Sequence, residues 1–197
     1  MSAARFSGQI NAFLEGALHY GVSSLGADAS SIQLEAVTRE EGRTQPPTSK
    51  LKPGSQAALM SRDKQEHLLV SLGVCGFDYR LVLLFQIEDK AATRDFFGST
   101  EAIQDRLGEF TNLVCGSLNR SLQRAYPSTG MSTPFSMSGA CFDQLQILRP
   151  DLRVTLNFLL NADVRLRIAY ALSLGRTFGF VENPPAEEES VGELELF

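Results

Sequence analysis

Residues 103–122 combine an apolar stripe and a polar stripe on opposite sides of one predicted helix, and this pattern constrains the fold most. At about 100° per residue, five apolar residues fall within a stripe roughly 80° wide: Ile103, Leu107, Phe110, Val114 and Leu118. Four residues fall on the opposite side, within about 60° of one another: Asp105, Glu109, Asn112 and Gly116. Such a helix buries one face against other elements and leaves a compact carboxylate and carboxamide site in solvent.

Two of these exposed positions are poor choices for helix stability alone. Glu and Asn on a wet helical face are ordinary surface residues, and by themselves they indicate no function. Gly116, however, stands in mid-helix, where Ala would be more stable by about 0.5–1 kcal/mol. Asn112 is also a mediocre helix former. The pattern therefore favours a surface that another molecule approaches closely.

Length and composition are those of a globular domain. The chain has 197 residues, of which 43% are hydrophobic and 21% charged, which favours one domain or one domain with a tail. No run approaches the roughly 20 apolar residues that cross a bilayer. The first residues contain no apolar signal core. We therefore expect a cytoplasmic protein that does not engage a membrane.

The negative charge is concentrated at the C-terminal end. The net charge is −5, and residues 182–197 contain six Glu and no Lys or Arg. The remaining chain has 18 basic residues and 23 − 6 = 17 acidic ones, a balance near +1. This balance does not favour nucleic-acid binding. We expect residues 1–180 to form the domain and residues 181–197 to form an acidic, disordered tail or a strand added to a sheet edge.

The cysteines and histidines do not form a recognisable metal or disulfide pattern. Cys75, Cys115 and Cys141 have no C-x-x-C spacing and no histidine neighbours, so we expect small buried hydrophobic roles for them. His19 and His67 are the only histidines, and a structural or surface role is the default for both. The sequence predicts no metal site and no cofactor in this chain.

The predicted elements alternate between helices and strands. Helices are expected at 9–22, 90–97 and 100–126, with Ser99 or Thr100 as N-cap of the last. Strands are expected at 32–37, 67–73, 79–87, 135–137, 144–148, 153–160 and 165–174, and an exposed loop or weak edge at 39–57. This order, with consecutive hairpins, favours an α+β fold. We expect a two-layer sandwich with the long helices packed on one face of an antiparallel sheet.

The polar stripe also resembles a known signature. D-x-x-x-E-x-x-N followed by Pro, here Asp105, Glu109, Asn112 and Pro134, is similar to the pattern of the CheC/CheX/FliY chemotaxis phosphatases. The segment "LGEFTNLVCGSLNRSL" resembles the family's catalytic helix, and "TPFSMSGACFDQLQI" its Pro-led strand. "LLVSLGVCGFDYRLVLLFQI" and "VRLRIAYAL" resemble the hairpin before that helix and the last strand. The resemblance covers roughly residues 6–175 and implies the same two-layer fold.

The resemblance implies a phosphatase that acts on the aspartyl phosphate of a CheY-type response regulator. Asn112 would orient the attacking water, and Glu109 would pair with a lysine of the receiver. Asp105, Gly116 and Pro134 would contact the partner, and the Mg²⁺ would belong to the receiver site. The alternative is a CheX-like binding module, without catalysis, for a receiver or a flagellar or signalling protein.

The first half of the chain does not repeat the polar pattern. In the CheC branch of the family both halves carry an active stripe, whereas here Asn11 and Leu14 stand where Glu and Asn would be expected. This difference favours a CheX-like chain with one site. We also expect a homodimer through sheet edges, on the grounds that strands such as 81–85 and 165–174 have no covering charge.

Overall fold

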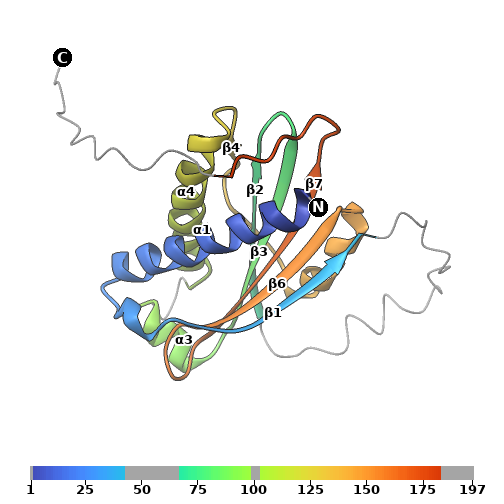
Figure 1. Cartoon of the computed structure of the whole chain (residues 1–197). Coiled ribbons are helices and arrows are strands. Elements are labelled where there is room, and N and C mark those ends of the chain that lie inside the picture. The colour runs from blue at the N-terminus through green and yellow to red at the C-terminus, as the bar shows by residue number, and fades with distance from the viewer. Residues whose placement is uncertain (1, 43–66, 99–102, 183–197) are drawn as a thin grey trace, which may run out of the picture.

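The computed structural model describes residues 2–42, 67–98 and 103–182, which form helices around one sheet (Figure 1). The helices are α1 (Ser2–Ser24), η1 (Ala29–Ser31), α3 (Ala91–Phe96), α4 (Ile103–Ala125) and η2 (Gly139–Leu148). The strands are β1 (Gln33–Glu41), β2 (His67–Cys75), β3 (Tyr79–Glu88), β4 (Gly130–Met131), β5 (Phe135–Ser138), β6 (Leu152–Leu159) and β7 (Arg165–Leu174). No helix in these ranges is long and apolar enough to span a bilayer.

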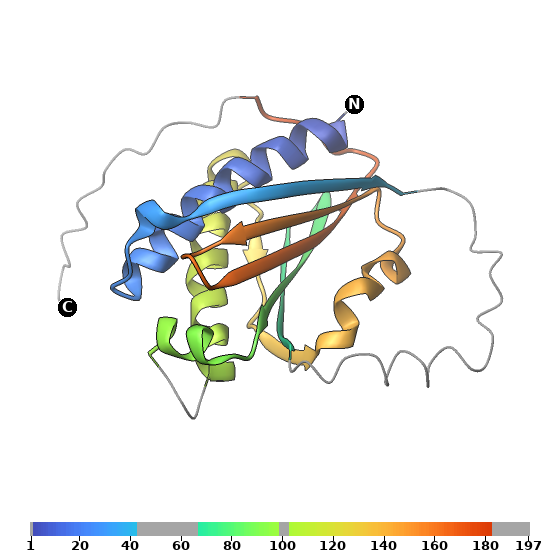
Figure 2. The ribbon, with the colours of Figure 1, turned by 90° about the horizontal axis from the view of Figure 1, so that it is seen from below.

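The seven strands make one antiparallel sheet, and α1 and α4 cover one of its faces (Figures 1 and 2). The order is β1-β6-β7-β3-β2-β4, with β5 also paired to β2. The two halves of the chain, α1–β3 and α4–β7, contribute equivalent strands. The edge strand β1 of the first half pairs with β6 of the second, and β5 of the second half pairs in the same way with β2 of the first. The predicted α+β sandwich is confirmed, and its halves are interleaved in one sheet.

One predicted strand is wrong. Residues 144–148 belong to the 3-10 helix η2, which packs on the sheet face opposite α1 and α4 (Figure 2). Phe142 and Leu145 lie three residues apart, which is the period of a 3-10 helix. Both are buried with Leu69 and Leu84 of the sheet in a second, smaller core. The alternating sequence suggests a strand, but the period of three decides which side chains are buried.

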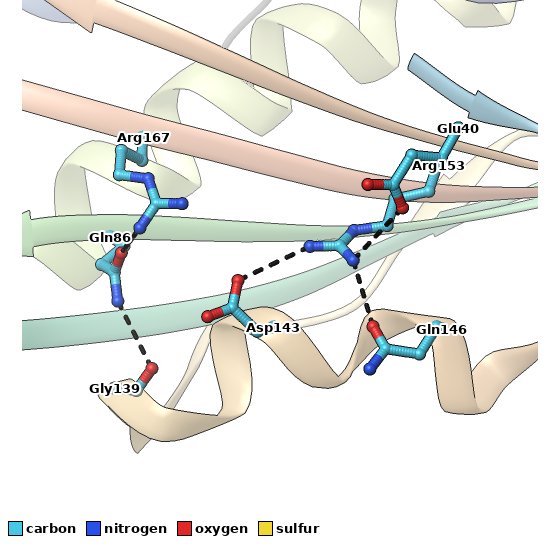
Figure 3. Close-up of polar contacts among 7 residues, drawn as sticks. All are labelled: Glu40, Gln86, Gly139, Asp143, Gln146, Arg153 and Arg167. Carbon is cyan, nitrogen blue, oxygen red and sulfur yellow. Dashed lines mark hydrogen bonds and ion pairs between the residues drawn. The ribbon is translucent and has the colours of Figure 1, made fainter. Parts of the chain in front are cut away.

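Side-chain contacts tie η2 to the sheet (Figure 3). Arg153 of β6 donates from Nη1 to Gln146 Oε1 at 3.0 Å, and it lies 3.5 Å from Glu40 and 3.7 Å from Asp143. At the other end of η2, Gln86 Nε2 donates to the carbonyl of Gly139 at 3.3 Å. These arginine and glutamine contacts are internal to the chain, so they hold η2 in place.

The strands cited for a homodimer interface are central. Strand β3 pairs with β2 and β7, and β7 pairs with β3 and β6, so neither offers a free edge. Their apolar sequences reflect burial between neighbours rather than an uncovered edge. The sheet ends in β1 on one side and in β4 and β5 on the other. Residues 39–41, for which a loop or a weak edge was expected, belong to the edge strand β1. The homodimer stays a prediction.

Helices α1 and α4 cross in close contact. Phe110, Val114 and Leu118 of α4 are fully buried, as the stripe predicts. A Cβ atom at Gly21 of α1 would lie 2.8 Å from Val114 Cγ2 and 3.0 Å from the Phe110 ring. Glycine at this position therefore lets the two helices approach more closely than any other residue would allow.

A buried polar group fixes α1 on the sheet. Tyr170 of β7 lies 2.8 Å from Ser7 Oγ, and its hydroxyl donates to Asn11 Oδ1 at 2.7 Å. Burial raises the pKa of Tyr170 to about 12, so the phenol stays neutral and keeps its proton for this bond. The buried Ser7 and Tyr170 hydroxyls and the half-buried Asn11 carboxamide thereby satisfy one another, and leaving either hydroxyl unpaired would destabilise the fold.

Replacing Gly21 by Ala should destabilise the protein, although Ala is the better helix former. The added Cβ overpacks the crossing, and we expect the free energy of unfolding to fall by about 1–3 kcal/mol. Gly16→Ala on the same helix is the matched control, because nothing lies within 4 Å of a Cβ there. That variant should gain about 0.5–1 kcal/mol. Urea unfolding measures both, and equal gains would contradict the close crossing.

Candidate functional site

The exposed face of α4 carries the polar residues that the sequence singled out. Asp105, Glu109 and Asn112 are exposed, and Gly116 is half-buried. They share this face because the apolar stripe of α4 turns inward against α1 and the sheet. The structure thus brings four of the five predicted site residues onto one helical surface.

Glu109 is held by a surface ion pair. Arg106 Nη1 lies 3.1 Å from Glu109 Oε2, and the side chains of Arg106 and Glu109 are 50% and 66% exposed. Exposed pairs of this kind contribute about 0–1 kcal/mol. The Glu109 carboxylate can therefore exchange Arg106 for a cation on another molecule at small cost.

The Asn112 carboxamide is free to act on a second molecule. No described residue hydrogen-bonds to its side chain, and the residue stands one turn beyond Glu109 on the solvent side. Truncating it would remove no core contact. Its amide oxygen can accept, and its amide nitrogen can donate, a hydrogen bond to a partner or to water.

The packing of this chain does not explain Gly116. A Cβ added there would meet only Arg120 Nη1, at 3.9 Å. Ordinary van der Waals contact with the end of a flexible side chain would not exclude Ala. The space above Gly116 is therefore available to something outside the chain.

Pro134 lies on the neighbouring segment, between β4 and β5. It is half-buried, and both of these short strands contact α4. Gln104 of α4 donates to Ser136 Oγ at 2.8 Å, which joins the helix to β5. Pro134 thus borders the exposed face of α4 without lying on it.

Sequence reasoning missed the apolar residues beside this polar face. Leu113 is 36% exposed on α4, and Phe135, directly after Pro134, is 54% exposed. A signal existed for Leu113, since it falls outside the apolar stripe of its own helix. Leu113 therefore adds an apolar side chain beside Asn112 on α4, a mixture of apolar and polar groups of the kind found at protein interfaces.

Among the described residues, Cys115 is not available as a nucleophile, and no metal-binding cluster is found. Cys115 is buried in an apolar core, which raises the pKa of its thiol and keeps it protonated. Cys75 is exposed, so the expectation that all three cysteines are buried is wrong for this residue at a strand end. No group of three or more His, Cys, Asp or Glu side chains in the described ranges could hold a metal ion.

The first half of the chain has no equivalent polar site at the two positions considered. Leu14 is fully buried. Asn11 points inward and accepts the hydrogen bond from Tyr170. Both residues serve the core, so at these two positions α1 does not present a carboxylate and carboxamide pair like that of α4.

Comparison with solved structures identifies the fold. No protein-family model matches the sequence, and no curated protein matches it. CheX of Vibrio vulnificus superposes with a TM-score of 0.56 and 13% identity, over 84% of this chain and 99% of that one. A CheC-like protein of Shewanella oneidensis gives 0.52 and 17%, over 83% and 96%. FliM of H. pylori, solved as a complex with SpeE, gives 0.51 and 15%, over 85% of each chain.

The chain therefore has the fold of the CheX/CheC-like chemotaxis proteins, as the resemblance in the sequence predicts. At identities of 13–17%, this likeness concerns the fold. The roles of Asp105, Glu109, Asn112, Gly116 and Pro134 remain predictions.

Gly116→Ala should stabilise the isolated protein. Among the described residues the new methyl group meets only the end of the Arg120 side chain, at 3.9 Å, and Ala in mid-helix is favoured by about 0.5–1 kcal/mol. Urea unfolding of wild type and variant measures the difference. A loss of stability would mean that the backbone of α4 needs glycine there for its own packing.

Proposed function

We propose that this protein is a phosphatase for the aspartyl phosphate of a CheY-type response regulator, as a cytoplasmic component of chemotaxis-type signalling. The observation that supports the proposal most strongly is the Glu109–Asn112 pair, exposed on the free face of α4 in a CheX/CheC-like fold. The pair stands where a second protein can reach it. It also has the chemistry that hydrolysis of an acyl phosphate requires.

The substrate bond is already activated, so positioning provides most of the catalysis. In the hydrolysis a water oxygen bonds to phosphorus, the bond from phosphorus to the aspartyl oxygen breaks, and aspartate leaves as a carboxylate. The protons of the water stay on the inorganic phosphate that forms. Neither a covalent catalyst nor a strong base in this chain is needed. A water held in line with the breaking bond supplies the rate gain.

Asn112 is the residue that positions this water. Its carboxamide oxygen accepts a hydrogen bond from the water and aims the oxygen lone pair at phosphorus, as the water-positioning glutamine does in GTPases. The Mg²⁺ belongs to the receiver, where it neutralises charge on the phosphoryl group. Asn112 can enter that site because α4 presents it outward and no described residue holds its side chain.

Glu109 fixes the docking register. In the free protein it pairs with Arg106 at 3.1 Å, and in the complex it exchanges this cation for the receiver's lysine. Charge pairs at an interface set orientation and association rate. Asp105 and Pro134 border the contact, and Gly116 gives the receiver clearance to approach the backbone of α4.

The alternative function is a binding module without catalysis. The H. pylori FliM structure is a complex with another protein, so a similar fold does serve protein binding. The same α4 surface would then be an interface for a receiver or for a flagellar or signalling protein. The presence of both Glu109 and Asn112 favours the enzyme, because an interface alone does not require this pair.

Asn112→Ala should abolish stimulated dephosphorylation while it leaves folding and receiver binding nearly intact. The side chain makes no core contact, so stability should change by under about 0.5 kcal/mol. Loss of one water-positioning contact typically costs about 10²-fold or more in rate. Single-turnover decay of a phosphorylated receiver at saturating protein measures the effect. Wild-type decay rates in the variant would refute the mechanism.

Glu109→Ala should act differently, because it removes a docking contact. We expect weaker binding to a receiver carrying a stable phosphate mimic, together with a slower rate. Stability should hardly change, since the lost ion pair with Arg106 is exposed. Titration of the receiver against each variant separates the two residues. Unchanged affinity in Glu109→Ala would remove Glu109 from the interface.

A further inference from the structure

An exposed aromatic residue on α1 lies beside the proposed site on α4. Tyr20 is 49% exposed although it is a large side chain on a helix that packs into the core. The adjacent residue, Gly21, forms the close crossing with Val114 and Phe110 of α4. The crossing therefore brings the Tyr20 position against the flank of α4.

Arg120 connects Tyr20 to the candidate site. Its guanidinium carbon lies 5.9 Å from the centroid of the Tyr20 ring, within cation–π range. Its Nη1 atom is the nearest atom to the space above Gly116, at 3.9 Å from a Cβ built there. Arg120 thus spans from the glycine of the α4 site to the aromatic ring on α1.

Leu113 extends this surface toward Glu109 and Asn112. Leu113 is 36% exposed and follows Asn112 directly. Glu109, Asn112, Leu113, Gly116 and Arg120 fall on one side of α4 within about 100° by helical geometry. With Tyr20 across the crossing, the surface contains a tyrosine and an arginine, two of the residue types that are enriched at protein-binding hot spots.

We propose that Tyr20 and Arg120 form a second contact region for the receiver, continuous with the α4 site, that sets affinity rather than the chemical step. This inference rests on the proposed function, because it names the same partner. A receiver that places its phosphoaspartate over Asn112 lies against the same face of α4, so it also reaches Arg120 about two turns along the helix. There the Arg120 guanidinium pairs with acidic groups of the receiver at the border of its phosphorylation site, and Tyr20 buries its ring against the adjoining receiver surface.

The division of roles follows from position. Glu109 and Asn112 touch the reacting site, whereas Tyr20 lies on a different helix and reaches the partner only at its flank. Aromatic anchors contribute to binding in the ground state and in the transition state alike. Such uniform binding changes the half-saturation concentration and leaves the saturated rate in place.

The test is the rate of receiver dephosphorylation as a function of the concentration of this protein. Tyr20→Ala should raise the half-saturation concentration roughly tenfold, as expected for an interfacial aromatic residue, while the saturated rate changes by less than about twofold. Tyr20→Phe should restore affinity, because it keeps the ring. Arg120→Glu should also raise half-saturation and should make it less sensitive to salt.

Ile147→Ala is the matched control. Ile147 is 69% exposed, but it belongs to η2 on the opposite face of the sheet, so truncating it should leave half-saturation unchanged. Thermal unfolding of each variant separates lost contacts from lost folding. If Tyr20→Ala lowers the unfolding temperature, the half-saturation concentration of Arg120→Glu tests the contact region instead. Arg120 is exposed and makes no core contact, so this change should not affect folding.

The outcomes distinguish this inference from the proposed function. An active wild-type protein with unchanged half-saturation in Tyr20→Ala and Arg120→Glu overturns the second contact region and leaves the phosphatase intact. A wild-type protein that binds a beryllofluoride-activated receiver, but does not speed the decay of the phosphorylated receiver, overturns the phosphatase. The affinities of Tyr20→Ala and Arg120→Glu for the activated receiver then test the contact region. Absence of both binding and activity overturns both. A Tyr20→Ala variant that changes self-association in sedimentation, and not receiver affinity, assigns the surface to a second copy and overturns the inference.

Discussion

The structure depends on how α4 divides its surface between core and solvent. One side of the helix is fully buried against α1 and the sheet, with Phe110, Val114 and Leu118 at the centre. This contact is close because Gly21 removes a side chain from the crossing. Dispersion and hydrophobic burial at this point fix the rotation of α4 about its axis. The residues left on the other side are then held at defined positions on a rigid element, which is what a positioning site requires.

The chemistry that suits this surface needs little from the protein beyond position. An aspartyl phosphate is reactive, and the metal and lysine that neutralise it are expected in the receiver. In the proposed mechanism, the outward-facing carboxamide of Asn112 orients the attacking water, and the carboxylate of Glu109, one turn away, sets the docking register. The buried Cys115 thiol, whose pKa is raised by desolvation, offers no nucleophilic alternative. Under this proposal the site is complete only with a receiver bound, and the fit between the two surfaces determines specificity.

The sequence predicted the secondary structure and the buried face correctly where the pattern lies within one element. The helical period of 103–122 predicted the buried and exposed faces of α4, and the paired apolar runs predicted β2 and β3. The sequence-based prediction was wrong where contacts with other elements determine the structure. Residues 144–148 alternate like a strand, yet the burial of Phe142 and Leu145 makes them part of η2. Apolar β3 and β7 suggested free edges but are central. The approach of Arg120 to Tyr20 follows from the helix crossing, which no local pattern encodes.

A crystal structure of this protein with a beryllofluoride-activated receiver would test the central claim most directly. The account predicts that the exposed face of α4 enters the receiver's phosphorylation site. The Asn112 carboxamide should lie within hydrogen-bond distance of a water in line with the beryllium–aspartate bond, and Glu109 should pair with the receiver's lysine. A complex in which another surface binds the receiver, with Asn112 remote from the beryllofluoride, would contradict it.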